Sequence, residues 1–244
     1  NKIDIYVNDA FSVSHRKHTS MLIPRYVKIK SYAGLLLEKE INGLKKIKLK
    51  NCLYILGGAK PKDNVKLLGK NKILSCGLFG QVCFINKGKR LGEQEKYLKK
   101  GKYFIRISKN KLKKVQTPID FAVKIKGRRK EINVDDFPSK YEIFDIGEDT
   151  IKIYAGEIKK AKAIYMKGPA GDVAIKGFEK GTYSILRAIA SSKAYSLIGG
   201  GHLSDAIEKS KINKKKFNHI SLSGGALLNY IAGEKLPGLE ALKS

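Results

Sequence analysis

One stretch of the chain, KAYSLIGGGHL at Lys193–Leu203, constrains the fold more than any other. Its apolar, β-favouring run ends in the triple glycine Gly199–Gly201, and a segment compatible with a helix, His202–Ser210, follows at once. The pattern predicts a strand, a tight turn and a helix N-terminus, where free amides attract an anion and missing Cβ atoms let it approach. A plain turn between a strand and a helix is the alternative, but three consecutive glycines fit it poorly because each loses much chain entropy on folding.

The same design recurs at three other places. A predicted strand is followed by glycines in LYILGGAK, MKGPAG and SLSGGAL, which lie at Leu53–Lys60, Met166–Gly171 and Ser221–Leu227. Four such turns at the C-terminal ends of four parallel strands would line one edge of one sheet, which is where open α/β sheets bind their ligands. The repetition favours a phosphate site more strongly than any single turn does.

Strands that alternate with helices from residue 51 onward predict a doubly wound parallel α/β sheet. Before this part, we predict a strand over Lys2–Asp9 and a helix over Ser31–Lys48, separated by a polar, basic segment. Within the larger part, we expect Gly88–Lys114 to be a charged excursion on the surface and Gly127–Asp136 to be a polar loop.

The chain is strongly basic, with 50 Lys+Arg against 22 Asp+Glu and a formal net charge of +28. This charge predicts attraction to polyanions such as nucleotides and RNA. A lysine-rich proteome, such as that of a thermophile, explains the charge without a partner. The second interpretation is favoured because the lysines are scattered and lack the interleaved aromatic residues of a nucleic-acid platform.

Cysteine and histidine usage points to a reducing compartment and no structural metal. Cys52, Cys76 and Cys83 lie in apolar runs and are expected to be buried, reduced thiols. The four histidines lack the spacing of a metal cluster. Since no stretch predicts a membrane span or an export signal, we expect a cytoplasmic protein.

Eight short motifs stand in the order and spacing of phosphoglycerate kinases, so the chain resembles that family, and its variants are most similar to archaeal members. The resemblance runs from the first residues to the last. The motifs are VNDAF followed by His15 and Arg16, GGAK, DIG, GPAG, FEKGT, IGGGHLS, HISLSGGA and GEKLPGLEAL.

This resemblance implies two Rossmann-like domains across a cleft, one for 3-phosphoglycerate and one for ATP or ADP with Mg²⁺. It also implies phosphoryl transfer between ATP and a carboxylate, achieved by positioning and charge neutralisation. Residues 1–50 then correspond to the rear of the N-terminal domain with the interdomain helix, and residues 51–244 to the C-terminal nucleotide domain. Most of the N-terminal domain has no counterpart in this sequence, and a monomer is expected.

The resemblance further implies the site residues. Lys60 would stabilise the transferring phosphoryl group with Gly200 and Gly224, the latter within Ser223–Gly225. Arg16, which is also a candidate catalytic residue, would contact the acid substrate together with Asp9 and His15. The implied nucleotide-binding positions are Gly57, Gly58, Lys60, Gly77, Gly168, Pro169, Gly199, Gly200, Gly201, His202 and Leu203.

Four positions depart from the family pattern. Ala174 replaces the carboxylate that usually binds ribose, and His202 stands where many relatives have an aspartate near the metal. Lys167 replaces an asparagine before GPAG, and Asn64 replaces a second lysine after GGAK. Two alternatives to an active kinase stay open. The net charge and the lost ribose carboxylate motivate a degenerate kinase fold that binds RNA or another polyanion, and the expected exposed edge of the Lys2–Asp9 strand motivates a partner for a separately encoded N-terminal half.

Overall fold

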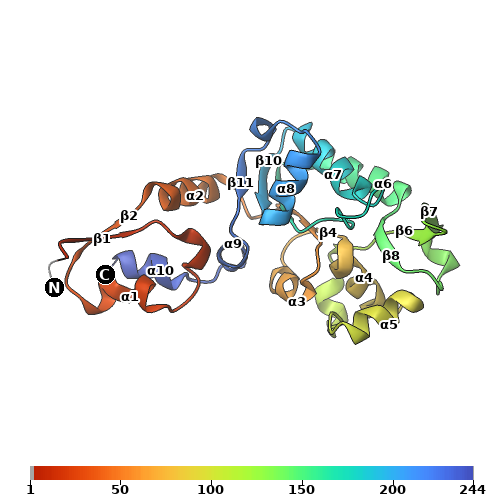
Figure 1. Cartoon of the computed structure of the whole chain (residues 1–244), viewed down its shortest axis with the longest axis horizontal. Coiled ribbons are helices and arrows are strands. Elements are labelled where there is room, and N and C mark those ends of the chain that lie inside the picture. Colours follow the sequence, from red (N-terminus) through yellow and green to blue (C-terminus); the bar gives the residue numbers. More distant parts are fainter. Residues whose placement is uncertain (1–2, 244) are drawn as a thin grey trace.

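A computed structural model describes residues 3–243 and shows a large α/β lobe joined to a smaller lobe that holds both chain ends (Figure 1). Lys2, the first residue of the predicted N-terminal strand, lies outside the described residues. The large lobe contains β3 (Leu53–Leu56), α3 (Pro61–Asn64), β4 (Ile73–Ser75), α4 (Gly77–Asn86), α5 (Glu93–Lys100), β5 (Val115–Gln116), β6 (Asp120–Ile125), β7 (Arg128–Asn133), β8 (Ile143–Ile146), α6 (Glu148–Lys160), β9 (Ala163–Lys167), α7 (Lys180–Ala190), β10 (Tyr195–Gly199), α8 (Gly201–Lys209), β11 (His219–Ser221) and α9 (Gly225–Ile231).

A six-stranded sheet in the order β11-β10-β9-β3-β4-β5 forms the centre of the large lobe, and all its neighbouring strands are parallel. The chain adds strands outward from β3 in one direction and from β9 in the other, so the sheet reverses between these two strands. The predicted doubly wound parallel sheet is confirmed. Such a reversal is the topological switch point at which open α/β sheets bind ligands.

Strand β3 shows why the sheet is covered on both faces. All four of its residues are buried, as expected for a strand between two helix layers. Tyr54 and Leu56 face a core shared with α2 (Leu35–Lys46), α4 and α9. Leu53 and Ile55 face the opposite core, which is built with α6, α7 and α8.

Two segments of the large lobe differ from the prediction. The expected polar loop Gly127–Asp136 contains β7, which pairs with β6 in a small antiparallel sheet of order β7-β6-β8. Lys126 and Gly127 both have positive φ, which suits a tight hairpin turn. The pairing is a local hairpin, but β7 is mostly exposed and reads RRKEIN, so its sequence lacks the alternating apolar pattern of a strand. The expected excursion Gly88–Lys114 contains α5 and packs on the core, with Leu91 and Leu98 fully buried.

The smaller lobe is built from both ends of the chain. It contains β1 (Ile5–Asn8), α1 (Thr19–Tyr26), β2 (Lys30–Ala33) and α10 (Pro237–Glu240), and α1 packs against α10 and the turn that follows it. The division of the chain at residue 50 stays a prediction, but α10 lies with the first part (Figure 1). The predicted helix Ser31–Lys48 was wrong at its start, because Ser31 belongs to β2, which pairs with β1.

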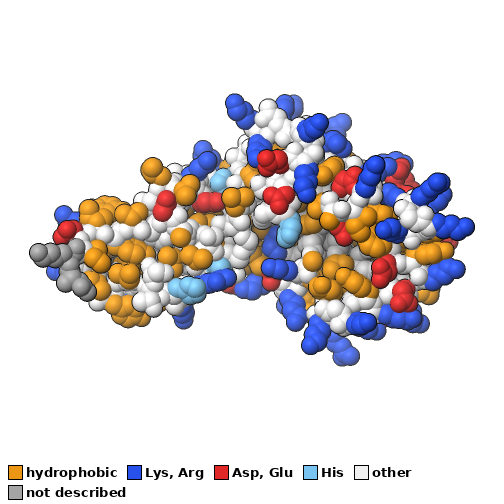
Figure 2. All heavy atoms as spheres, in the orientation of Figure 1, with side chains coloured by type: hydrophobic (Ala, Val, Ile, Leu, Met, Phe, Trp, Pro, Cys, Tyr) orange, Lys and Arg blue, Asp and Glu red, His pale blue; other side chains and the backbone are white. Residues whose placement is uncertain are grey.

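This smaller lobe exposes apolar side chains. Ile5 and Val7 on β1 are 54% and 55% exposed, and Tyr32 on β2 is also exposed. Figure 2 shows hydrophobic side chains gathered over this lobe, whereas lysines and arginines dominate the large one. A two-stranded sheet is marginal on its own. Within residues 3–243, no helix is long and apolar enough to cross a membrane.

Helix α2 connects the lobes and packs against β11, the outer strand of the large sheet. Gly43 lies directly against the His219 ring of β11, and its carbonyl accepts a hydrogen bond of 2.9 Å from the Tyr195 hydroxyl. The Glu40 carboxylate lies 2.9 Å from His219 Nε2 and accepts from the Ser221 hydroxyl at 3.1 Å. Glycine at position 43 is therefore a packing requirement of the helix that connects the two lobes.

We expect Gly43→Ala to destabilise the protein by about 1–3 kcal/mol, because its Cβ would lie 2.3 Å from the His219 ring. The matched control is Gly156→Ala on α6, where a Cβ would meet nothing within 4 Å. That change should stabilise by about 0.5–1 kcal/mol through helix propensity. Urea unfolding of both variants checks the prediction, and equal effects of the two substitutions would contradict it.

Candidate functional site

The predicted glycine turns lie side by side at the C-terminal ends of the sheet strands. Strands β11, β10, β9 and β3 are consecutive neighbours, and each is followed by one of the four turns. We call this edge the crest and define it by Gly57–Lys60, Gly168–Gly171, Gly200–Gly201 and Ser223–Gly225. The shared location of the four turns, which rested on pattern alone, is confirmed by the parallel topology.

At the switch point, glycines bring two turns into direct contact. The Gly58 amide donates to the Pro169 carbonyl at 2.8 Å. A Cβ on Gly57 would lie 2.3 Å from that same oxygen, and one on Gly168 would lie 2.5 Å from the Gly57 oxygen. A Cβ on Gly77 would lie 2.6 Å from the Gly58 nitrogen. These positions need glycine for backbone packing, whatever else they contact.

Glycines at the other end of the crest face open space. A Cβ at Gly200, Gly201 or Gly224 would meet nothing within 4 Å. The Gly200 amide donates to the Ser221 carbonyl at 2.9 Å, which fixes the turn, and its φ of +103° favours glycine. Helix α8 begins at Gly201, so the orphan amides of its first turn point toward this space. This is the geometry of an anion seat.

Three predicted neighbours of that seat have different roles. Gly199 lies beneath α9, since a Cβ there would be 2.5 Å from Leu227. His202 is exposed on the first turn of α8. Leu203 is fully buried in the core, and its amide already donates to the Gly200 carbonyl at 3.1 Å. The geometry therefore does not support a ligand contact by Leu203.

Lys60 and Lys167 place ammonium groups at the switch point. Lys60 is exposed at the start of α3. Lys167 ends β9, and its mostly buried side chain donates to Asn64 Oδ1 at 3.0 Å, with the Asp63 carboxylate at 3.7 Å. Burial lowers the pKa of Lys167, Lys60 lowers it further, and Asp63 opposes the shift. Asn64 also donates to the Gly57 carbonyl at 3.0 Å, so the two departures from the family pattern form one hydrogen-bonded pair.

The smaller lobe brings His15 to the N-terminus of α9. A Cβ on Gly225 would lie 2.7 Å from His15 Nε2. Burial lowers the pKa of His15, and Arg16 lowers it further, which favours the neutral ring beside the positive end of α9. Arg16 is exposed. Asp9 accepts a hydrogen bond of 3.0 Å from the Leu37 amide in the first turn of α2, which gives this carboxylate a structural task.

Several residues to which sequence reasoning gave no role form hydrogen bonds that hold the backbone near the GPAG turn of the crest. Asp145, in the DIG motif, accepts from Arg129 Nη1 at 2.7 Å and from the Gly181 amide at 2.7 Å. Burial raises the pKa of Asp145 to about 6, although the Arg129 guanidinium opposes this. Thr182, in FEKGT, accepts from the amides of Ala170 and Gly171 at 3.0 and 3.2 Å. The motifs were visible in the sequence, but Arg129 lies in the expected loop and had no signal.

The crest does not form a metal site of its own. Among residues 3–243, no three His, Cys, Asp or Glu side chains converge on a point that could hold a metal ion. His202 offers a ring nitrogen, whereas Mg²⁺ prefers oxygen ligands. A carboxylate does lie near the GPAG turn: Glu179 is the N-cap residue of α7, and its Oε2 is buried without a hydrogen-bond partner in the described structure.

A parallel α/β domain with an open helix N-terminus and ammonium groups at its switch point has the geometry of α/β domains that bind phosphate groups. A family model described as phosphoglycerate kinase matches residues 1–234. The chain is 41% identical to the phosphoglycerate kinase of Methanothermus fervidus, over 99% of this chain and 62% of that protein. The chain belongs to the phosphoglycerate kinase family.

Solved structures agree with this assignment. The crystal structure of phosphoglycerate kinase from Pyrococcus horikoshii matches 99% of this chain and 64% of its own, with a TM-score of 0.86 and 34% identity. The enzyme structure from Coxiella burnetii matches with a TM-score of 0.81 and 27% identity. The resemblance inferred from the motifs, including its similarity to archaeal members, is confirmed. The chain spans about three fifths of the length of the relatives it matches.

Proposed function

We propose that this chain is the nucleotide-binding part of a phosphoglycerate kinase, which transfers a phosphoryl group between ATP and the carboxylate of 3-phosphoglycerate. The observation that carries the proposal is the open N-terminus of α8 at Gly200 and Gly201, on the same crest as Lys60 and Lys167. Family membership and the kinase names of the relatives support it.

In this proposal, the nucleotide phosphates lie on the amides at Gly200–Gly201. Lys60 and Lys167 neutralise charge on the transferring group, which needs positioning and charge stabilisation more than covalent chemistry. Gly224, where a Cβ would meet nothing within 4 Å, leaves room for that group at the neighbouring turn. Mg²⁺ would arrive with the nucleotide and neutralise phosphate charge. His15 and Arg16 would face the acid substrate from the smaller lobe.

Gly201→Val tests the anion seat. No atom lies within 4 Å of its Cβ position, so the fold should hold while the side chain occupies the seat. We expect affinity for Mg-ATP to fall by about tenfold or more, a loss of ~1.4 kcal/mol or more. Titration calorimetry measures the affinity, and thermal melting checks that the fold is intact.

Gly156→Val is the matched control, because it adds the same side chain to α6 at another open position. Its affinity for Mg-ATP should equal that of the unmodified chain. Unchanged affinity in Gly201→Val, or no binding of Mg-ATP to the unmodified chain, would remove the proposed nucleotide site.

The Lys167–Asn64 pair generates a second test. The family motifs have lysine at the position of Asn64 and asparagine at the position of Lys167, the reverse of this chain. Here the two side chains are hydrogen-bonded to each other. We propose that one ammonium group is required and that either position can supply it. Lys167→Asn should lower affinity for Mg-ATP by about tenfold or more, since a hydrogen bond to a charged group contributes ~1.5–3 kcal/mol.

The double variant Asn64→Lys with Lys167→Asn should restore most of that affinity, because the lysine at position 64 then supplies the ammonium group that position 167 has lost. Calorimetry on the three proteins gives the comparison, with melting temperatures as the check on folding. If the double variant binds as weakly as Lys167→Asn while both remain folded, the exchange of roles is wrong.

A further inference from the structure

Two adjoining cavities lie at the N-terminal ends of the sheet strands, opposite the crest. Their volumes are about 350 and 630 Å³, and both are lined by Asn51, Lys160 and Ala161. They lie beside Leu53 and Ala163, the first residues of β3 and β9. Because the strands are parallel, this edge holds their N-terminal ends and is separate from the proposed nucleotide site. We call the pair the lysine cavity.

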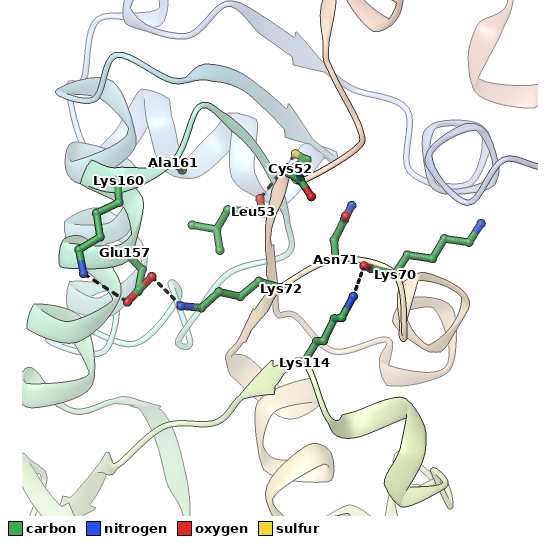
Figure 3. Close-up of a pocket in the computed structure, with 10 residues that line it drawn as sticks. Cys52, Leu53, Lys70, Asn71, Lys72, Lys114, Glu157, Lys160 and Ala161 are labelled. Carbon is green, nitrogen blue, oxygen red and sulfur yellow. Dashed lines mark hydrogen bonds and ion pairs between the residues drawn. The ribbon is translucent and has the colours of Figure 1, made fainter.

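The lysine cavity is strongly basic. Glu157 is the one carboxylate among its lining residues, and it accepts from Lys72 at 2.6 Å with Lys160 at 3.7 Å. Figure 3 shows these two lysines on either side of Glu157, and Lys114 directed at the Lys70 carbonyl, 3.0 Å away. Eight lysines line the two cavities: Lys46, Lys48, Lys50, Lys70, Lys72, Lys114, Lys160 and Lys162.

Helix dipoles account for a minority of these charges. Lys46 and Lys160 end α2 and α6, where a cation is favourable. The remaining six lysines lie in the connections between helices and strands. Lysines that line one hollow give it a positive potential. An anion in the hollow would be attracted by that potential.

We propose that the lysine cavity binds a compact oligophosphate, an anion in which several phosphate groups are linked. Lysine ammonium groups bind phosphate as point charges, and the volumes lie in the range of small-molecule sites. Tyr195 is the one aromatic residue in the lining, and its hydroxyl is held by the Gly43 carbonyl. A cavity without free stacking platforms favours a phosphate chain over single-stranded RNA.

Calorimetry with inorganic tripolyphosphate on the full chain tests this site. The test variant replaces Lys48, Lys50 and Lys162 with glutamine. The control replaces three exposed lysines on α5, β6 and β7, Lys100, Lys124 and Lys130, with glutamine and changes net charge equally. We expect the cavity variant to lose about tenfold or more in affinity at low salt and the control less than about twofold.

A second arm identifies the source of the phosphate chain. ATP is titrated into Gly201→Val, whose crest is blocked, with and without the three cavity substitutions. Cavity-dependent binding of ATP would assign the site to nucleoside polyphosphates, and binding of tripolyphosphate alone would assign it to inorganic chains; either result supports the site. Absence of tripolyphosphate binding at low salt, or an equal loss in the cavity and control variants, would overturn the proposal. Binding of long RNA alone, reduced equally in both variants, would show diffuse attraction and would also overturn it.

Discussion

The structure depends on the contact between two backbone turns at the switch point of the sheet. Gly57 and Gly168 approach so closely that a Cβ on either would fall within 2.3–2.5 Å of the other turn, and the Gly58–Pro169 hydrogen bond fixes their register. This contact aligns the ends of β3 and β9. Lys60, Asn64 and Lys167 take their positions from those ends, so the proposed chemistry follows from a packing constraint.

Much of the fold was predictable because its signals are local. A strand, glycines and a helix in succession specify one unit, and four such units specify a parallel sheet with one crest. The glycines look alike in sequence, yet the structure separates them into two kinds. Gly57, Gly77 and Gly168 serve packing, whereas Gly200, Gly201 and Gly224 leave open space. That difference depends on which turns come into contact in the fold, and a local sequence pattern does not predict it.

The features that sequence reasoning missed depend on a pairing partner rather than on their own residues. Strand β7 forms because β6 offers it a partner, and β2 replaces the expected start of a helix because β1 lies beside it. The support that Arg129 gives Asp145 depends on that same unexpected strand. The pairing of Lys167 with Asn64 joins positions 103 residues apart, so each looked like an isolated departure until the fold brought them together. The lysine cavity is also invisible to a local pattern, because its eight lysines are scattered in the sequence.

We propose that the crest transfers a phosphoryl group to and from 3-phosphoglycerate. The most direct measurement is a coupled assay of ADP formation from ATP and 3-phosphoglycerate, run on this chain and on the chain extended to the length of its relatives. We expect turnover in the extended protein, reduced about 100-fold or more by Lys60→Ala through loss of transition-state charge stabilisation. Turnover in neither protein, with Mg-ATP binding also absent, would mean that the fold has been kept for another purpose.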